Sequence, residues 1–117
     1  MESKYKTIFE KQKSNKDAIE ILVEKELYTP AVQILWTITR NSIFSFLERR
    51  KIDFHSTQEA ITIFILGQDS PKKMKCIYEA YTSSIISEWD EDALISKKQF
   101  KIFEKSCLLI QSMMIND

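Results

Sequence analysis

Two residues in this chain have side chains that could together act on a phosphate ester. Arg50 and His55 follow a long apolar stretch and have four residues between them. An imidazole titrates near neutral pH and can act as a general acid or base, and a guanidinium can stabilise a charged phosphorane. The pair predicts a metal-independent ribonuclease. The alternative is that His55 is an ordinary histidine of a surface loop.

A second polar group, Arg40 with Asn41, interrupts the middle of the apolar stretch. A buried charge is costly unless it is paired and hydrogen-bonded. Two alternatives give Arg40 a structural role: an ion pair with another helix, or a place on a solvent-exposed stripe. The residues concerned are Glu20 and Glu24 for the ion pair and Gln33 and Thr37 for the stripe. The functional alternative is an anion site, for example for a nucleotide phosphate.

A basic cluster, Arg49-Arg50-Lys51, closes the apolar stretch. Positive charge is favourable at the carboxyl end of a helix, so the cluster is typical of helix termination. The alternative is a patch that faces phosphate. We therefore take Arg40, Asn41 and Arg49 as candidate ligand-binding residues, beside His55 and Arg50 as candidate catalytic residues.

Other site chemistries find little support. The single glycine, Gly67, cannot build a phosphate-binding loop. Cys76 and Cys107 form no Cys-x-x-Cys pair, and with one histidine they complete no zinc site. We expect two buried free thiols, no metal and no cofactor. The acidic run 90–92 is expected to be a solvated loop, since adjacent carboxylates point apart.

The composition limits the class of protein. Of the 117 residues, 44% are hydrophobic and 11% aromatic, which is enough for one packed core. One Gly and two Pro suit a helical bundle better than an all-β fold. Seventeen basic residues balance 17 acidic ones. This balance excludes a protein held to nucleic acid mainly by a large positive field.

Apolar periodicity and capping residues predict five helices. Their starts are marked by Ser14, by Thr29 with Pro30, by a Ser56–Glu59 capping box, by Ser70 with Pro71, and by a Ser96–Gln99 box. The expected ranges are 14–27, 29–50, 57–66, 71–88 and from 96 onward, with Gly67 ending the third helix in a left-handed conformation. Residues 1–13 are an N-terminal extension that either continues the first helix or adds a turn. The fold class is all-α: an up-and-down bundle of four main helices plus one short helix, in a single domain over 14–117.

The helix expected over 29–50 has apolar residues nearly all round, so it must be covered on nearly all sides. In a short chain it is either the central element of the bundle or one side of a subunit interface. The second alternative motivates a homodimer. The amino terminus has no secretory signal, and no segment approaches the roughly 18 apolar residues that span a bilayer. We therefore expect a cytoplasmic protein that binds no membrane.

Taken in order, these features resemble the HEPN superfamily, the higher eukaryotes and prokaryotes nucleotide-binding domain. The resemblance covers roughly residues 14–114. It depends on a short first helix ending Glu26-Leu27-Tyr28, the apolar second helix from Ala31, and a final helix launched by Leu94-Ile95-Ser96. Between them stand Leu47-Glu48-Arg49-Arg50-Lys51-Ile52 and Phe54-His55-Ser56.

The resemblance implies a helical bundle that commonly forms homodimers. Some members of this family are ribonucleases or toxins, and others lack catalysis and act beside a nucleotidyltransferase. The family's nuclease motif, an Arg followed four to six positions later by His, lies near the end of the helix matching 71–88. Here that region, residues 81–89, contains neither Arg nor His, and Arg50 and His55 fall in another connection.

These observations give one main hypothesis and two alternatives. The first is a non-catalytic HEPN-like module that self-associates and binds a partner protein, such as a nucleotidyltransferase, or a nucleotide. The second is a ribonuclease or toxin that uses His55 and Arg50 on RNA. The third is a helical adaptor or regulatory protein that binds no nucleotide.

Overall fold

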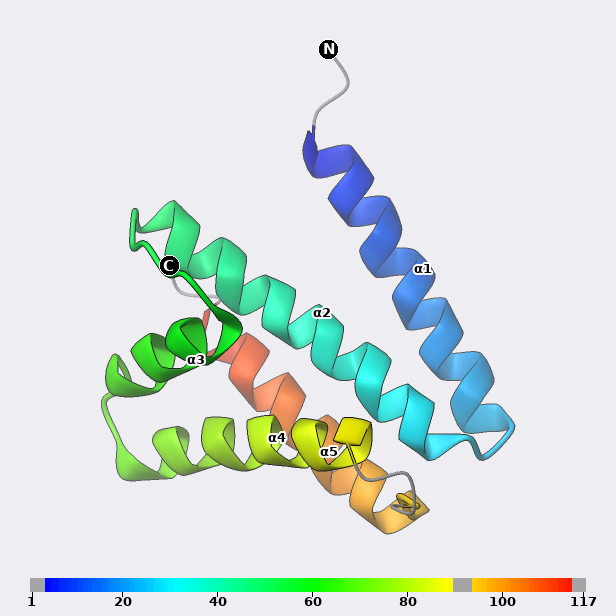
Figure 1. The fold of residues 1–117 in the computed structure, drawn as a ribbon. Helices are drawn as coiled ribbons and strands as arrows, with labels where there is room; N and C mark the ends of the chain where they lie inside the picture. Colours follow the sequence, from blue (N-terminus) through cyan, green and yellow to red (C-terminus); the bar gives the residue numbers. More distant parts are fainter. Residues whose placement is uncertain (1–3, 90–93, 115–117) are drawn as a thin grey trace.

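The computed structural model describes residues 4–89 and 94–114, with side chains in those ranges from Lys13 onward. These residues form five helices and no strand. The helices are α1 (Lys4–Glu24), α2 (Tyr28–Arg49), α3 (Thr57–Leu66), α4 (Pro71–Trp89) and α5 (Lys97–Ser112) (Figure 1). The predicted all-α bundle is confirmed. The acidic run 90–92 lies outside the described residues.

Helix α2 is the central element, as its apolar sequence predicts. In the described part of the chain it packs against each of the other four helices, whereas α1 packs against α2 alone. Its eight buried side chains face these neighbours. A narrow exposed stripe remains, made of Gln33, Asn41, Ser45 and Glu48. The apolar circumference of α2 is therefore enclosed within one subunit, and it leaves no broad apolar face for a second one.

The contacts between helices fix their directions. The start of α2 meets the end of α4, where the Gln33 side-chain amide donates to the Ser87 carbonyl at 3.2 Å. Tyr28 packs against Phe100 at 5.7 Å between ring centroids, so α2 and α5 start at the same end. Helix α4 runs antiparallel to both of them (Figure 1). This arrangement sets α4 and α5 side by side on one flank of α2.

The core is built from side chains of all five helices. Its largest fully buried members include Phe64, Phe100, Ile43 and Leu47. Thr39, the one buried threonine among residues 13–89 and 94–114, is satisfied, because its hydroxyl donates to the Leu35 carbonyl at 3.0 Å. A buried hydroxyl without such a partner would cost about 1–3 kcal/mol.

The start of the first helix differs from the prediction. The described part of the N-terminal extension, from Lys4 onward, belongs to helix α1, so Ser14 is an interior residue instead of an N-cap. The buried contact with α2 is made by Ile19, while Ile21 and Leu27 are exposed. Polar residues separate the apolar positions of this segment, so the sequence alone does not show which of them face α2.

The predicted caps are confirmed for the later helices but not for α2. Ser96 and Gln99 form the reciprocal capping box of α5, and Ser56 accepts the backbone N–H of Glu59 at 3.1 Å in α3. Thr29, predicted to cap α2, lies inside this helix, whose N-cap is Leu27. The Thr29 hydroxyl instead accepts the backbone N–H of Ile95 at 3.2 Å, which fixes the start of the last helix against α2.

The expected left-handed ending at Gly67 is wrong. Gly67 has φ −82° and ψ −4°, which is a right-handed conformation. The left-handed residues are Glu26 and Lys51, both with φ 59°. They close α1 and α2 through paired bonds: after α2, the Lys51 N–H bonds to the Glu48 carbonyl and the Ile52 N–H to the Leu47 carbonyl, each at 3.0 Å. This pair of backbone hydrogen bonds is the Schellman motif, which is formed here without glycine.

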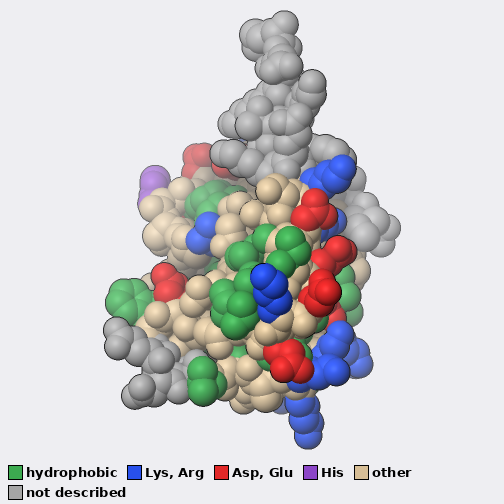
Figure 2. All heavy atoms as spheres, turned by 90° about the vertical axis from the view of Figure 1, so that its right-hand side faces the viewer, with side chains coloured by type: hydrophobic (Ala, Val, Ile, Leu, Met, Phe, Trp, Pro, Cys, Tyr) green, Lys and Arg blue, Asp and Glu red, His purple; other side chains and the backbone are tan. Residues whose placement is uncertain are grey.

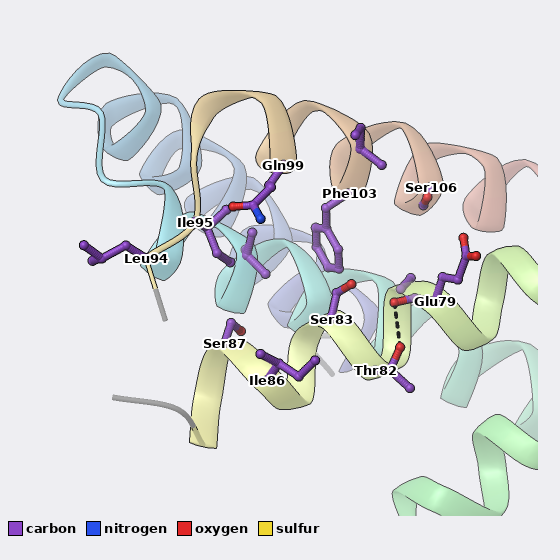
Figure 3. Close-up of a pocket in the computed structure, with 13 residues that line it drawn as sticks. Glu79, Thr82, Ser83, Ile86, Ser87, Leu94, Ile95, Gln99, Phe103 and Ser106 are labelled. Carbon is purple, nitrogen blue, oxygen red and sulfur yellow. Dashed lines mark hydrogen bonds between the residues drawn. The ribbon is translucent and has the colours of Figure 1, made fainter. Parts of the chain in front are cut away.

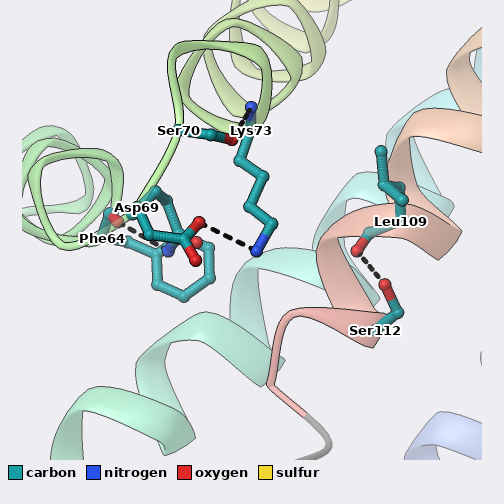
Figure 4. A network of polar contacts seen from close by, with 7 residues as sticks. Phe64, Asp69, Ser70, Lys73, Leu109 and Ser112 are labelled. Carbon is teal, nitrogen blue, oxygen red and sulfur yellow. Dashed lines mark hydrogen bonds and ion pairs between the residues drawn. The ribbon is translucent and has the colours of Figure 1, made fainter.

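A small polar network closes the α3–α4 connection (Figure 4). Lys73 pairs with Asp69 at 2.9 Å, and its backbone N–H bonds to the Ser70 hydroxyl at 3.3 Å. The hydrogen bond from Lys73 holds the pKa of Asp69 below its ordinary value. Ser70 therefore caps α4 as predicted, and the ion pair orders the turn before it.

The apolar face of α4 also differs from the prediction. The three- and four-residue spacing of its apolar residues predicts a stripe that includes Ile77, Tyr78 and Ile85. Ile77 is fully buried, but Tyr78 and Ile85 are 60% and 36% exposed. The other buried positions of α4 carry small side chains, namely Ala80, Ser84 and Ser87. Small residues let two helices approach closely, and α4 consequently keeps large apolar side chains on its outer face.

Candidate functional site

The two candidate catalytic residues occupy different surroundings at the end of α2. His55 is exposed in the α2–α3 connection, and it gives the purple surface patch in Figure 2. Phe54 before it stacks on Phe44 of α2, with 5.0 Å between ring centroids. The Arg50 guanidinium lies over the ring of Phe46, at 4.4 Å from its centroid.

These ring contacts place the Arg50 guanidinium and the Phe54 ring on different sides of α2. Residues two apart on a helix point about 200° apart, so Phe44 and Phe46 face opposite directions. Phe46 is turned towards α3, where it meets Phe64 edge-on at 5.5 Å. Arg50 therefore packs on the α3 side, and the segment leading into His55 packs on the other.

Arg40 is half-buried and lies over the Phe44–Phe54 pair, on the other side of α2 from Phe46. Its guanidinium carbon is 5.7 Å from the centroid of Phe44, the ring that stacks on Phe54. Within the described residues it makes no ion pair with Glu20 or Glu24, and its buried Nε has no hydrogen-bond partner. The structure thus brings Arg40 and the Phe54–His55 segment to one aromatic ring.

The other two candidate ligand-binding residues are open to solvent. Asn41 belongs to the exposed stripe of α2, and Arg49 is the last residue of that helix. The basic cluster therefore stands at the carboxyl terminus of α2, where the helix dipole favours it. On the face drawn in Figure 2, acidic and basic side chains are interspersed among hydrophobic ones, in keeping with the balanced net charge.

The most prominent surface feature lies elsewhere, on α4 and α5. Eleven large hydrophobic side chains are exposed in the described residues, and eight of them belong to these two helices or to the residues just before α5. The eight are Tyr78, Ile85, Ile86, Trp89, Leu94, Ile102, Leu108 and Leu109. Single exposed apolar residues are ordinary, but a concentration on one part of a surface marks an interaction site.

A groove runs through this apolar surface. It encloses about 400 Å³ between the antiparallel helices α4 and α5, and Val32 of α2 contributes to its floor. Figure 3 shows Phe103 reaching from α5 towards Ser83 and Ile86 on α4. Ile86 and Ile102, on opposite walls, are 57% and 60% exposed. We call this feature the α4–α5 groove.

The polar groups of the groove are largely engaged within the protein. The Ser87 hydroxyl donates to the Ser84 carbonyl at 2.8 Å, and the Gln99 side chain accepts the Ser96 N–H at 2.8 Å. The one ionisable side chain in the lining, Glu79, pairs with Lys75 of its own helix at 3.7 Å. No acid–base pair or nucleophile–base pair is therefore assembled in the groove, which is suited to bind apolar side chains.

Sequence reasoning did not find this groove, although α4 contains a sign of it. Small residues recur at Ala80, Ser83, Ser84 and Ser87. This spacing places them along one side of the helix, so that side approaches its neighbours closely. Of the large residues between them, Ile85 and Ile86 face outwards, whereas Tyr81 packs on Trp36. The prediction of an apolar stripe was right for Ile77, which is buried, and wrong for Tyr78 and Ile85.

Both cysteines are free, as predicted, but only Cys107 is fully buried, and Cys76 is half-buried. Burial raises the pKa of the Cys107 thiol to about 12. Burial also raises the pKa of Cys76, whose thiol donates to the Ser106 carbonyl at 3.7 Å. A thiol becomes a nucleophile or a metal ligand as the thiolate, which both environments disfavour. Across the described ranges, no three His, Cys, Asp or Glu side chains gather as a metal site would require.

Among the helices of the described residues, none has both the length and the apolar character needed to cross a membrane. The chain matches no protein-family model, and neither curated proteins nor solved structures give a significant match to it.

Proposed function

We propose that this chain is a non-catalytic helical module that binds another protein through the α4–α5 groove. The observation that supports this function is the exposure of three hydrophobic side chains that line the groove, Ile86, Leu94 and Ile102, on a surface where α4 and α5 expose five more. Exposed apolar area is favourable to cover, at roughly 25 cal/mol per Å². A groove between two helices commonly accepts a further helix.

The enclosure of α2 moves the expected interface. The homodimer hypothesis began from the apolar circumference of this helix, which the other four helices now account for. Any association of this subunit, with a partner protein or with a second copy, is therefore proposed at α4 and α5. A non-catalytic module that acts beside another protein, such as a nucleotidyltransferase, is also what the HEPN resemblance implies.

Photo-crosslinking tests the binding function. A benzophenone amino acid replacing Ile102 in the source cells should give a discrete protein adduct, and adding Ile86→Ser should remove it. The matched control places the same group at Ile21, which is 53% exposed on α1. Identical adducts at both positions, or none at Ile102, would contradict the proposal.

A nuclease assay tests the non-catalytic part of the proposal. Support comes from the separate packing of Arg50 on Phe46 and of Phe54 on Phe44. Incubation of the purified protein with cellular RNA should give the same cleavage pattern for wild type and His55→Ala. RNA cleavage that disappears in His55→Ala would establish the ribonuclease alternative instead.

A further inference from the structure

The exposed face of α5 beside the groove has a regular pattern of lysine and aliphatic residues, of which Ile102 lines the groove itself. Lys98, Ile102, Lys105 and Leu109 follow each other at four-, three- and four-residue steps, so they form one stripe along the helix. All four side chains are exposed. The two lysines are seven residues apart, or about 10 Å along the axis, and so are the two aliphatic residues. Each lysine is thus next to an apolar contact on the same exposed face.

Among the described residues, no carboxylate pairs with the two lysines of this stripe. Helix α5 contains four lysines and one glutamate, Glu104, which pairs with Lys101 at 3.7 Å. On the facing helix, Glu79 pairs with Lys75 at 3.7 Å. Lys98 and Lys105 make no ion pair with any described residue. A basic border therefore runs beside the apolar groove, although the whole chain has no net charge.

Building on the proposed function, we infer that the α4–α5 groove accepts an amphipathic helix of a partner protein whose apolar face is flanked by acidic residues. Its apolar side chains, spaced by three and four residues, fill the groove between Ile86 and Ile102. Its carboxylates, seven residues apart, face Lys98 and Lys105. This heptad pattern matches the repeat of the α5 stripe, as in helix pairs whose flanking charges select the partner.

The same charges argue against a second copy of this chain as the occupant. Two α5 stripes meeting across an interface would set unpaired lysines against each other. Like charges at an interface disfavour association, whereas an acidic flank gains from both lysines.

Binding of two designed peptides tests the inference. Each is a helix of about 18 residues with Leu at heptad positions a and d; one has Glu at e and g, and the other has Lys there. Trp89, 77% exposed at the end of α4, reports binding by a blue shift of its emission, and Trp89→Phe is the control for this signal. The Glu peptide should bind at least about tenfold more tightly than the Lys peptide.

Two variants identify the contacts. Lys98→Glu with Lys105→Glu should reverse the preference, and Ile86→Ser with Ile102→Ser should abolish binding of both peptides. All four residues are exposed, so these changes should leave the fold intact, which circular dichroism verifies.

The contrary outcomes separate the inference from the proposed function. Equal binding of both peptides, lost in the isoleucine variant, would overturn the acidic flank and leave the protein-binding groove standing. Binding of neither peptide, or binding that ignores the isoleucines, would overturn helix docking and the proposed function with it. A dimer in sedimentation velocity that the isoleucine variant dissociates would assign the groove to a second copy and overturn the inference.

Discussion

Trp36 of α2 packs against an aromatic ring of α4. It is 7% exposed, and its ring centroid lies 5.8 Å from that of Tyr81. Trp36→Ala should destabilise the protein by about 3–5 kcal/mol, because it removes a buried aromatic side chain and leaves a cavity. Urea unfolding measures the change. Trp89→Ala, at a 77% exposed position, is the matched control and should stay within about 0.5 kcal/mol of wild type.

The Cys107 thiol gives a prediction about alkaline pH. Because its pKa in the folded protein is raised to about 12, the native state keeps the proton that the unfolded chain loses near its ordinary value of 9.0. Below that value the two states bind this proton equally, and above it the free energy of unfolding falls as pH rises. The slope from one such group is at most about 1.4 kcal/mol per pH unit.

Urea unfolding at pH 8 and pH 10 for wild type and Cys107→Ala checks this prediction. Tyrosines and lysines titrate in the same range and contribute to both proteins, so the informative quantity is the difference between the two pH dependences. Wild type should lose more stability than the variant over this interval. Equal losses would mean that Cys107 ionises in the folded state as readily as in the unfolded one.

Single residues show what sequence can and cannot tell about the site. Exposure of Asn41 and Arg49 follows from their polarity and helical position. The separation of Arg50 from the Phe54–His55 segment does not, because it depends on the side of α2 on which Phe44 and Phe46 each pack. Spacing along the chain limits how far apart two groups can be, and packing decides their direction. The RNA cleavage assay with His55→Ala tests the role predicted for His55.

At the scale of helices, the sequence predicted the side-chain caps of α3, α4 and α5 better than the backbone motifs that end α1 and α2. An N-cap uses a side-chain oxygen, so Ser56 and Ser96 announce it in the sequence. The ends of α1 and α2 use backbone hydrogen bonds around Glu26 and Lys51, which are left-handed. Neither residue type favours a left-handed conformation, so the sequence does not mark these ends. The same limit affected α4, where Ala80 and Ser84 are inside and Tyr78 is outside. A hydrophobic pattern selects large apolar residues for the core, but the close packing of α4 on its neighbours requires small side chains.

The conformation of Gly67 at the end of α3 can be tested by substitution. Since its conformation is right-handed, Gly67→Ala should stabilise the protein by about 0.4–1 kcal/mol by lowering the entropy of the unfolded chain. The new Cβ would lie 3.5 Å from the Ile63 carbonyl oxygen and 3.6 Å from that of Phe64, which are ordinary contacts. Thermal unfolding measures the sign of the change.

Lys51 supplies the complementary control for Gly67. Its φ is 59°, so Lys51→Gly should relieve backbone strain, whereas Lys51→Ala should not. A loss of stability in Gly67→Ala would restore the left-handed ending that the sequence predicted.

At the scale of the whole molecule, burial is unevenly distributed. Helix α2 is covered by four neighbours, and α4 and α5 support each other as well as α2. The groove with its exposed isoleucines therefore lies between two helices that each pack on α2 and on each other. This arrangement suits binding, because a preformed surface loses less conformational freedom when a partner docks.

Helix α1 has the opposite situation, and hydrogen exchange should show it. Within the described residues it packs on α2 alone, and Ile19 is its one buried side chain between Lys13 and Glu24. Segments with few buried apolar contacts open at a lower free energy than the global unfolding reaction. Amides of α1 should therefore exchange at least about tenfold faster than those at the centre of α5. Ile19→Ala should speed exchange in α1 and leave α5 unchanged, whereas equal protection of both helices would show that the chain opens as one cooperative unit.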